Sequence, residues 1–199
     1  MDELRGAILE VQNKHRNVQG RCFVAEEDLR AVLTRDAVNQ ALYDKDIDKN
    51  CKLEPYHIDE AVDVVINGAH RVFAILVLIR YTKFILQFIQ GDNYQGSGLD
   101  QRLPFDKDKL RSIFQAQAPI EEFYDKQWHF TAPIFSDSVF TRLLPRETIL
   151  PITEEEQLGE GGFGNVYRIT IPPSHQRFQS ISRDREVGQS RPSSVTTPY

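Results

Sequence analysis

Three glycines in the C-terminal part of the chain have the spacing of a phosphate-binding loop. They are Gly159, Gly161 and Gly164, within a stretch that reads Leu158-Gly-Glu-Gly-Gly-Phe-Gly-Asn-Val166. Glycine is needed where the backbone adopts a positive φ, or where it approaches a phosphate that a Cβ would obstruct. The backbone N–H groups of such a loop can bind phosphate oxygens. The chemistry that this stretch suggests is therefore nucleotide binding.

The residues that follow the glycines separate two nucleotide-binding designs. A dinucleotide-binding loop opens into a helix whose N-terminus faces the pyrophosphate. Here the segment from Val166 to Ile171 is β-branched and aromatic apart from Arg168, which favours a strand. A strand, a glycine-rich turn and a second strand that together cover ATP phosphates are the arrangement found in protein kinases. The alternatives are a plain glycine-rich hairpin and a dinucleotide site with Asp184 as its ribose-binding acid.

Over roughly residues 149–171 the sequence resembles the start of a eukaryotic protein kinase domain, the glycine-rich loop of the N-terminal lobe. The resemblance implies that Leu158 and Val166 sandwich an adenine and that Phe163 caps the loop tip. It also implies ATP, with Mg²⁺, as the cofactor. The expected cofactor-binding residues are Leu158, Gly159, Glu160, Gly161, Gly162, Phe163, Gly164, Asn165 and Val166.

The parts of a kinase that carry catalysis are missing from this sequence. Phosphoryl transfer uses a lysine on the third strand, an H-R-D catalytic loop and a D-F-G motif that binds Mg²⁺. No lysine follows Lys126, and neither motif occurs. We expect no catalytic residue here, and a kinase domain that stops after its second strand. The expected function is that of an ATP-binding, Ser/Thr-type kinase-like protein, inactive as this chain alone. The alternative is a non-enzymatic helical interaction module that carries a vestigial kinase fragment.

The N-terminal part of the chain has the periodicity of helices. Residues 2–15 place Leu4, Ala7, Ile8 and Val11 on one helical face. Further helices are predicted over residues 25–43, from Pro55 to Gly68, after an Asp106 cap, and from Pro119 to about Trp128. The expected fold class is mainly α, with a helical region over 1–130, a linker over 131–148, an incomplete kinase N-lobe hairpin over 149–171 and a disordered tail over 172–199.

The segment from Val72 to Ile89 is the most apolar of the chain and is long enough to cross a membrane. Arg80, Lys83 and Gln87 recur in it at helical spacing and would form one polar stripe. Each basic residue near the middle of a span costs about 2.5–3.5 kcal/mol. We therefore expect one long central helix of a soluble bundle, with its stripe in water, in a cytoplasmic protein. A membrane span is the alternative.

The sequence gives little indication of a metal site or of nucleic-acid binding. The connector from Asp44 to Pro55 has the acidic residues of an EF-hand loop, but Lys49 stands where that loop needs glycine and Pro55 where it needs a bidentate glutamate. The five histidines and two cysteines lack zinc-ligand spacing, so no metal site is expected. A net charge of −5 argues against nucleic acid. The expected partners are ATP and a protein bound by the helical region.

Overall fold

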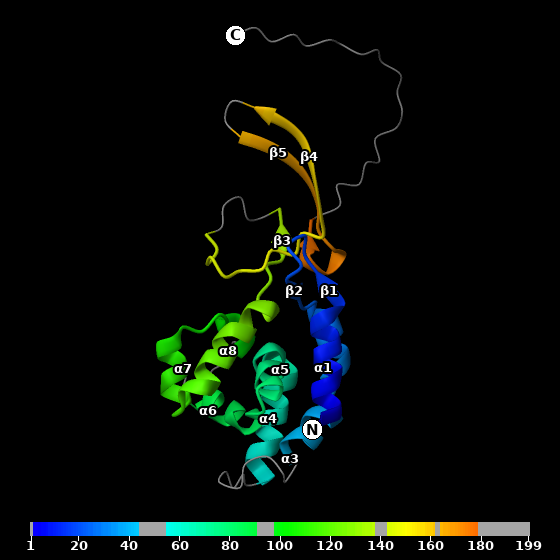
Figure 1. Ribbon diagram of the computed structural model, residues 1–199. Helices are drawn as coiled ribbons and strands as arrows, with labels where there is room; N and C mark the ends of the chain where they lie inside the picture. Colours follow the sequence, from blue (N-terminus) through cyan, green and yellow to red (C-terminus); the bar gives the residue numbers. More distant parts are fainter. Residues whose placement is uncertain (1, 44–54, 91–97, 138–142, 162–163, 179–199) are drawn as a thin grey trace.

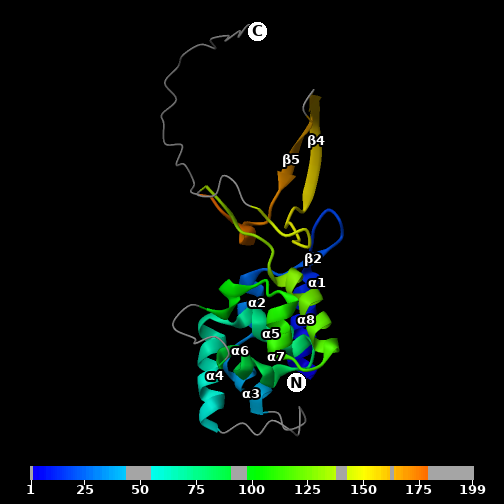
Figure 2. The same ribbon diagram turned by 90° about the vertical axis from the view of Figure 1, so that its left-hand side faces the viewer.

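The computed structural model describes residues 2–43, 55–90, 98–137, 143–161 and 164–178. It consists of a helical body and a two-stranded hairpin that projects from one end of that body (Figures 1 and 2). The longer helices are α1 (Asp2–Lys14), α2 (Glu26–Val32), α3 (Arg35–Tyr43), α4 (Pro55–Gly68), α5 (His70–Leu78), α6 (Ile85–Gln90), α7 (Lys107–Ile113) and α8 (Gln117–Phe130). The expectation of a mainly α fold is confirmed.

The strands are few and form three separate pairs. Strands β1 (His15–Arg16) and β2 (Cys22–Phe23) are antiparallel, β3 (Phe135–Ser136) and β6 (Gln176–Arg177) are parallel, and β4 (Glu154–Gly161) and β5 (Gly164–Thr170) form the antiparallel hairpin. Three short 3₁₀ helices, η1 (Thr82–Phe84), η2 (Leu99–Arg102) and η3 (Pro173–His175), complete the described elements.

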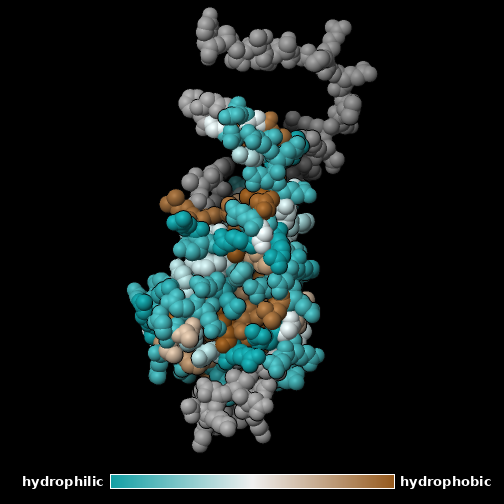
Figure 3. Space-filling view, viewed as in Figure 1, coloured by the Kyte–Doolittle hydropathy of each residue, from teal (hydrophilic) through white to brown (hydrophobic). Residues whose placement is uncertain are grey.

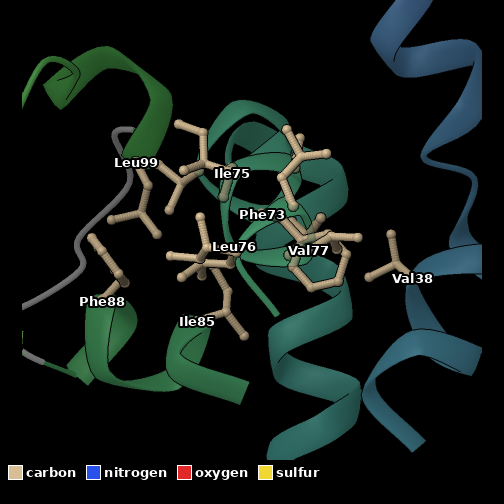
Figure 4. Close-up of a cluster of buried hydrophobic side chains, with 14 of the residues drawn as sticks. Val38, Phe73, Ile75, Leu76, Val77, Ile85, Phe88 and Leu99 are labelled. Carbon is tan, nitrogen blue, oxygen red and sulfur yellow. The ribbon is translucent and has the colours of Figure 1, made fainter. Parts of the chain in front are cut away.

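Helix α5 is the centre of the body. Every side chain from Val72 to Leu78 is at most 2% exposed, as expected for a helix that is apolar on all sides. Helices α1, α4, α6 and α8 and the 3₁₀ helix η2 all contact it. Figure 4 shows Ile75 facing Leu99 on one side of α5 and Val38 lying on another. The core of the body is therefore built around this one helix.

Both ends of α5 depend on hydrogen bonds that the periodicity of the sequence does not indicate. At its start, the carboxylate of Asp100 in η2 accepts from the backbone N–H groups of Arg71 and Val72 at 3.0 Å. Burial raises the pKa of Asp100 to about 6. Close contact between Gly68 and Gly98 lets η2 reach this position, because a Cβ on Gly68 would lie 2.8 Å from the Cα of Gly98.

The expected single helix from Val72 to Ile89 is wrong, because α5 ends at Leu78 and α6 begins at Ile85. Arg80 has a φ of 65°, its N–H donates to the carbonyl of Val77, and the N–H of Tyr81 donates to the carbonyl of Leu76. These two bonds are those of a Schellman C-cap. The residue in the left-handed position is usually glycine, and here it is arginine, so the sequence carries no stop signal.

The expected helix over residues 25–43 is also divided into two, α2 and α3. Thr34 lies at the break, and its Oγ1 accepts a hydrogen bond from the N–H of Ala37 at 3.3 Å. Threonine is a favoured N-cap residue, and here it begins α3 within a continuous apolar pattern. The Asp106 cap of α7 is confirmed, since its Oδ1 accepts from the N–H of Lys109 at 2.7 Å.

No single helix of the described residues is both long enough and apolar enough to cross a membrane. The segments Ile58–Gly68 and His70–Leu78 meet the length and composition criteria only as a pair, and they are bent by 114° relative to each other. The expected EF-hand-like connector lies almost wholly outside the described residues.

The tail begins later than the expected boundary at residue 172. Residues 173–177 form η3 and β6, and β6 pairs with β3. His175 is 3% exposed and contacts Phe23 edge to face, with 5.1 Å between ring centroids, while His15 stacks on the same Phe23. This aromatic contact orders a segment whose composition predicts disorder. Residues from 179 onwards lie outside the described part of the chain.

The docking of His175 makes stability depend on pH. Burial, with the charges of Arg71 and His15 adding to it, lowers the pKa of His175 to about 4. The neutral form is favoured in the folded state, so the contribution is complete above the unfolded pKa of ~6.5 and is lost as the pH falls toward 4. Relative to His175→Phe, the wild-type chain should lose on the order of 1–3 kcal/mol of unfolding free energy between pH 7 and pH 4.

Urea titrations of both proteins at several pH values, followed by circular dichroism, would measure this difference. A difference between the two proteins that does not change with pH would contradict the assignment of a buried, neutral His175.

Candidate functional site

The glycine-rich stretch lies in the projecting hairpin. Strands β4 and β5 pair from Glu154 opposite Thr170 to Gly161 opposite Gly164. The register shifts between Gln157 and Gly159, so Leu158 lies in a β-bulge. The two strands predicted from the sequence on either side of the glycines are thus present and pair with each other. Of the nine expected cofactor-binding residues, Gly162 and Phe163 at the turn lie outside the described residues.

The fold of the hairpin requires glycine at position 164 but not at position 159. Gly164 has a φ of 141°, a conformation that side-chain-bearing residues rarely adopt. Gly159 has no such constraint, and a Cβ added to it would meet no atom of the chain within 4 Å. Gly164 is therefore required by the backbone of the hairpin itself, whereas nothing in the described structure requires glycine at position 159.

Leu158 and Val166, the expected adenine contacts, come from neighbouring strands. Leu158 directly precedes Gly159, and Gly159 is the register partner of Val166. Their exposed fractions are 53% and 60%, which are large values for aliphatic residues. The two residues thus lie on neighbouring strands and are open to solvent, and no described residue encloses them in an adenine pocket.

Polar contacts across the strands hold the hairpin together. The guanidinium of Arg168 pairs with Glu156 at 2.8 Å, and the hydroxyl of Thr170 donates to Glu154 at 2.8 Å. Within β5, the side-chain amide of Asn165 also donates to the hydroxyl of Tyr167 at 3.3 Å. Residues 154–160 and 164–170 are all exposed. Solvated pairs of this kind contribute about 0–1 kcal/mol each, so the hairpin has little stabilisation of its own.

The base of the hairpin is anchored to the helical body. The N–H of Val18 donates to the carbonyl of Ile152 at 2.8 Å, and the Asn17 amide donates to the carbonyl of Leu150 at 3.2 Å. Ile149 is 1% exposed and belongs to a small apolar cluster with Phe23, Trp128 and Ala132. The turn between β1 and β2 therefore contacts the base of the hairpin, and the glycines lie well beyond it (Figure 2).

The described residues do not supply the hairpin with a cluster of metal ligands or with an excess of positive charge for the phosphates of ATP. Within the described ranges, no group of three or more His, Cys, Asp or Glu side chains could hold a metal ion. Glu154, Glu155, Glu156 and Glu160 make β4 acidic, so its side chains would repel phosphates rather than bind them. What the hairpin offers a nucleotide is thus the backbone N–H groups between Gly159 and Gly164 and two aliphatic side chains.

A cavity of about 420 Å³ lies between the end of α8 and the segment that leads to the hairpin. Its lining includes Asp100, Trp128 and the exposed Leu143 and Leu144. Figure 3 shows hydrophobic residues between the body and the hairpin. None of the lining residues was among the candidate site residues predicted from the sequence, where Trp128 appears only as a helix end. Asp100 is already bonded to the start of α5, which gives this buried carboxylate a structural role. None of the described glycine-rich residues lines this cavity.

Comparisons with protein-family models, with curated proteins and with solved structures found no match to this chain. The likeness to protein kinases therefore rests on the residues of the hairpin.

The exposure of the hairpin side chains leads to a stability prediction. Because Val166 and Leu158 are more than half exposed, Val166→Ala and Leu158→Ala should each change the unfolding free energy by less than about 0.5 kcal/mol. Leu76→Ala in the centre of α5, where the side chain is fully buried, should cost about 2–5 kcal/mol. Urea denaturation followed at 222 nm would compare them. A loss above about 1 kcal/mol for Val166→Ala would mean that another part of the chain covers the hairpin.

Proposed function

We propose that residues 149–171 are the glycine-rich hairpin of a protein-kinase-type ATP site, and that the chain is a kinase-like protein whose helical body carries this hairpin. The observation that carries the proposal is the antiparallel pair β4–β5, in which Leu158 and Val166 flank the glycine-rich stretch and are both exposed. In this assignment the backbone from Gly159 to Gly164 covers the phosphates of ATP, and the two aliphatic side chains contact the adenine.

Gly159, like Gly6 in α1, is not required by the described fold, and its open backbone suits a ligand-binding role. A glycine that serves the fold has a positive φ or a close neighbour, as Gly164 and Gly68 have. Gly159 has neither among the described residues. A glycine with open space around its Cα keeps the backbone accessible to a phosphate group, whose oxygens accept hydrogen bonds from N–H groups in their path.

This hairpin supplies one side of a nucleotide site. Phosphoryl transfer depends on charge stabilisation by Mg²⁺ and lysine and on a positioned catalytic aspartate. No lysine follows Lys126 in the sequence, and the described residues hold no cluster of metal ligands. We infer that this chain by itself neither transfers phosphate nor encloses ATP. The helical body would serve as a regulatory or protein-binding module in a cytoplasmic setting, which the reduced Cys22 would suit.

The second candidate is a non-enzymatic interaction protein that uses the hairpin and the helical body only as binding surfaces. It is favoured by the exposure of apolar side chains along both strands, which include Tyr167 and Ile169 at 44% each. The two candidates differ in what the glycines do: in the first they bind phosphate, and in the second they only shape the turn.

The first candidate predicts weak nucleotide binding by the isolated chain. Calorimetry with ATP and Mg²⁺ should show no saturable binding below about 1 mM, equivalent to less than roughly 4 kcal/mol, because adenine meets one wall and the metal no ligands. Micromolar ATP binding that Gly161→Val abolishes would contradict the inference that the site is incomplete. It would mean that the helical body forms the rest of the ATP site.

Transfer of the hairpin tests the kinase assignment itself. In a chimera, residues 153–171 would replace the first two strands of an active protein kinase. The chimera should remain active, with a KM for ATP within about tenfold of that of the original kinase. Gly161→Val in that chimera should lower kcat/KM by at least about tenfold, since its side chain obstructs the phosphates, whereas the matched exposed change Glu155→Ala should not. A folded chimera with no activity, or one indifferent to Gly161→Val, would favour the interaction protein.

A further inference from the structure

Both edges of the hairpin are uncovered by other described strands and could pair with a strand of a second molecule. The hairpin is a separate two-stranded sheet, so β4 and β5 each have one edge that no other described strand covers. An uncovered edge presents unpaired N–H and C=O groups and is a template for another strand. Both views show the hairpin extending clear of the helical body, so a second molecule could reach it (Figures 1 and 2).

Charged side chains oppose strand pairing at the β4 edge but not at the β5 edge. Strand β4 contains Glu154, Glu155, Glu156 and Glu160, and acidic side chains along an edge oppose pairing with another copy of the same strand. Strand β5 reads Gly-Asn-Val-Tyr-Arg-Ile-Thr, with Arg168 as its single charge. That charge is paired with Glu156 of the same hairpin. Nothing in β5 resists a neighbouring strand.

We propose that the β5 edge is a self-association site, at which β5 of one molecule pairs antiparallel with β5 of a second copy to form a four-stranded sheet. This inference is independent of nucleotide binding and of the proposed function. The second copy is preferred over another partner because pairing of β5 with itself places Tyr167 opposite its own equivalent, and an aromatic pair across strands is favourable. A two-fold axis at Tyr167, the midpoint of Gly164–Thr170, aligns all seven residues of the strand.

The register follows from the side chains. With the axis at Tyr167, the two tyrosines lie opposite each other, Asn165 lies opposite Ile169 of the second copy, and Val166 lies opposite its Arg168. The aromatic pair at the axis is favourable across neighbouring strands. Moving the axis by one residue to Arg168 would place two arginines opposite each other, and like charges in that position are destabilising.

The same arrangement limits the assembly to two copies. In the order β4–β5–β5–β4 the outer edges are both β4, and their glutamates oppose the addition of further strands. The interface is isologous and therefore closed. It also gives each β5 a neighbour on both sides, which relieves the marginal stability of a two-stranded sheet. Since one strand pair is small by the standards of stable interfaces, we expect a dissociation constant of roughly 10–100 µM.

Sedimentation velocity over a concentration series tests the association. The wild-type chain should change from monomer to dimer between about 1 and 200 µM, as its small interface predicts. Tyr167→Lys places two ammonium groups at the axis and should weaken the dimer by at least about tenfold. Gln157→Lys, at the register partner of Tyr167 on the outer strand, is the matched control and should leave the dimer intact. Circular dichroism of both variants checks that the helical body is folded.

Oxidative cross-linking tests the register in a Cys51→Ser background, where the remaining native thiol, Cys22, is buried. Tyr167→Cys should form an intermolecular disulfide, because opposite residues in neighbouring antiparallel strands have Cα atoms about 4.5–5.5 Å apart. Gln157→Cys should not, because the two β4 strands would be three strand spacings, about 14 Å, apart. A chain that is monomeric throughout, a dimer unaffected by Tyr167→Lys, larger oligomers, or equal cross-linking at both positions would each overturn the proposal.

Discussion

The burial of α5 on all sides is the constraint on which the helical body depends. Seven consecutive apolar side chains, Val72 to Leu78, leave water completely or nearly so. Burying one such side chain contributes about 1.5–3 kcal/mol, and a helix that is apolar all round needs neighbours on every face. The body supplies them with α1, α4, α6 and α8. Because the helix ends are buried too, their N–H and C=O groups need partners, and Asp100 and the Arg80 cap provide these bonds.

The hairpin is the opposite case, because it has strand pairing without a core. Its residues are exposed on both faces, and the contacts between its strands are solvated pairs such as Arg168 with Glu156. The body holds only its base, through Ile149 and the β1–β2 turn. The two strands of the hairpin are therefore weakly stabilised by the rest of the described chain. A nucleotide, further strands or a second copy that covers the hairpin would gain the free energy of burying its apolar side chains.

Much of the fold could be predicted from the sequence, and the parts that could not share a physical cause. Helices α1, α4 and α7 follow from apolar periodicity, with Pro55 and the Asp106 cap marking two of their starts. The breaks at Thr34 and Arg80 lie within continuous apolar patterns and depend on backbone hydrogen bonds, which periodicity does not report. The docked segment around His175 depends on Phe23, which is distant in the sequence. For the candidate site, the motif predicted the two strands, but the β-branched and aromatic residues of β5 do not indicate how exposed the strand is. Its full exposure is evident only in three dimensions.

Hydrogen exchange of the native chain tests most directly whether the hairpin lacks a core and stands apart from the body. At about 1 µM, well below the expected dimerisation range, the backbone amides of 154–161 and 164–170 should exchange through local opening. Those of α5 should exchange only on global unfolding, with protection at least about 10³-fold greater, equivalent to roughly 4 kcal/mol. Equal protection of the hairpin and α5 would contradict the account, because it would mean that the glycine-rich strands belong to the same cooperative core.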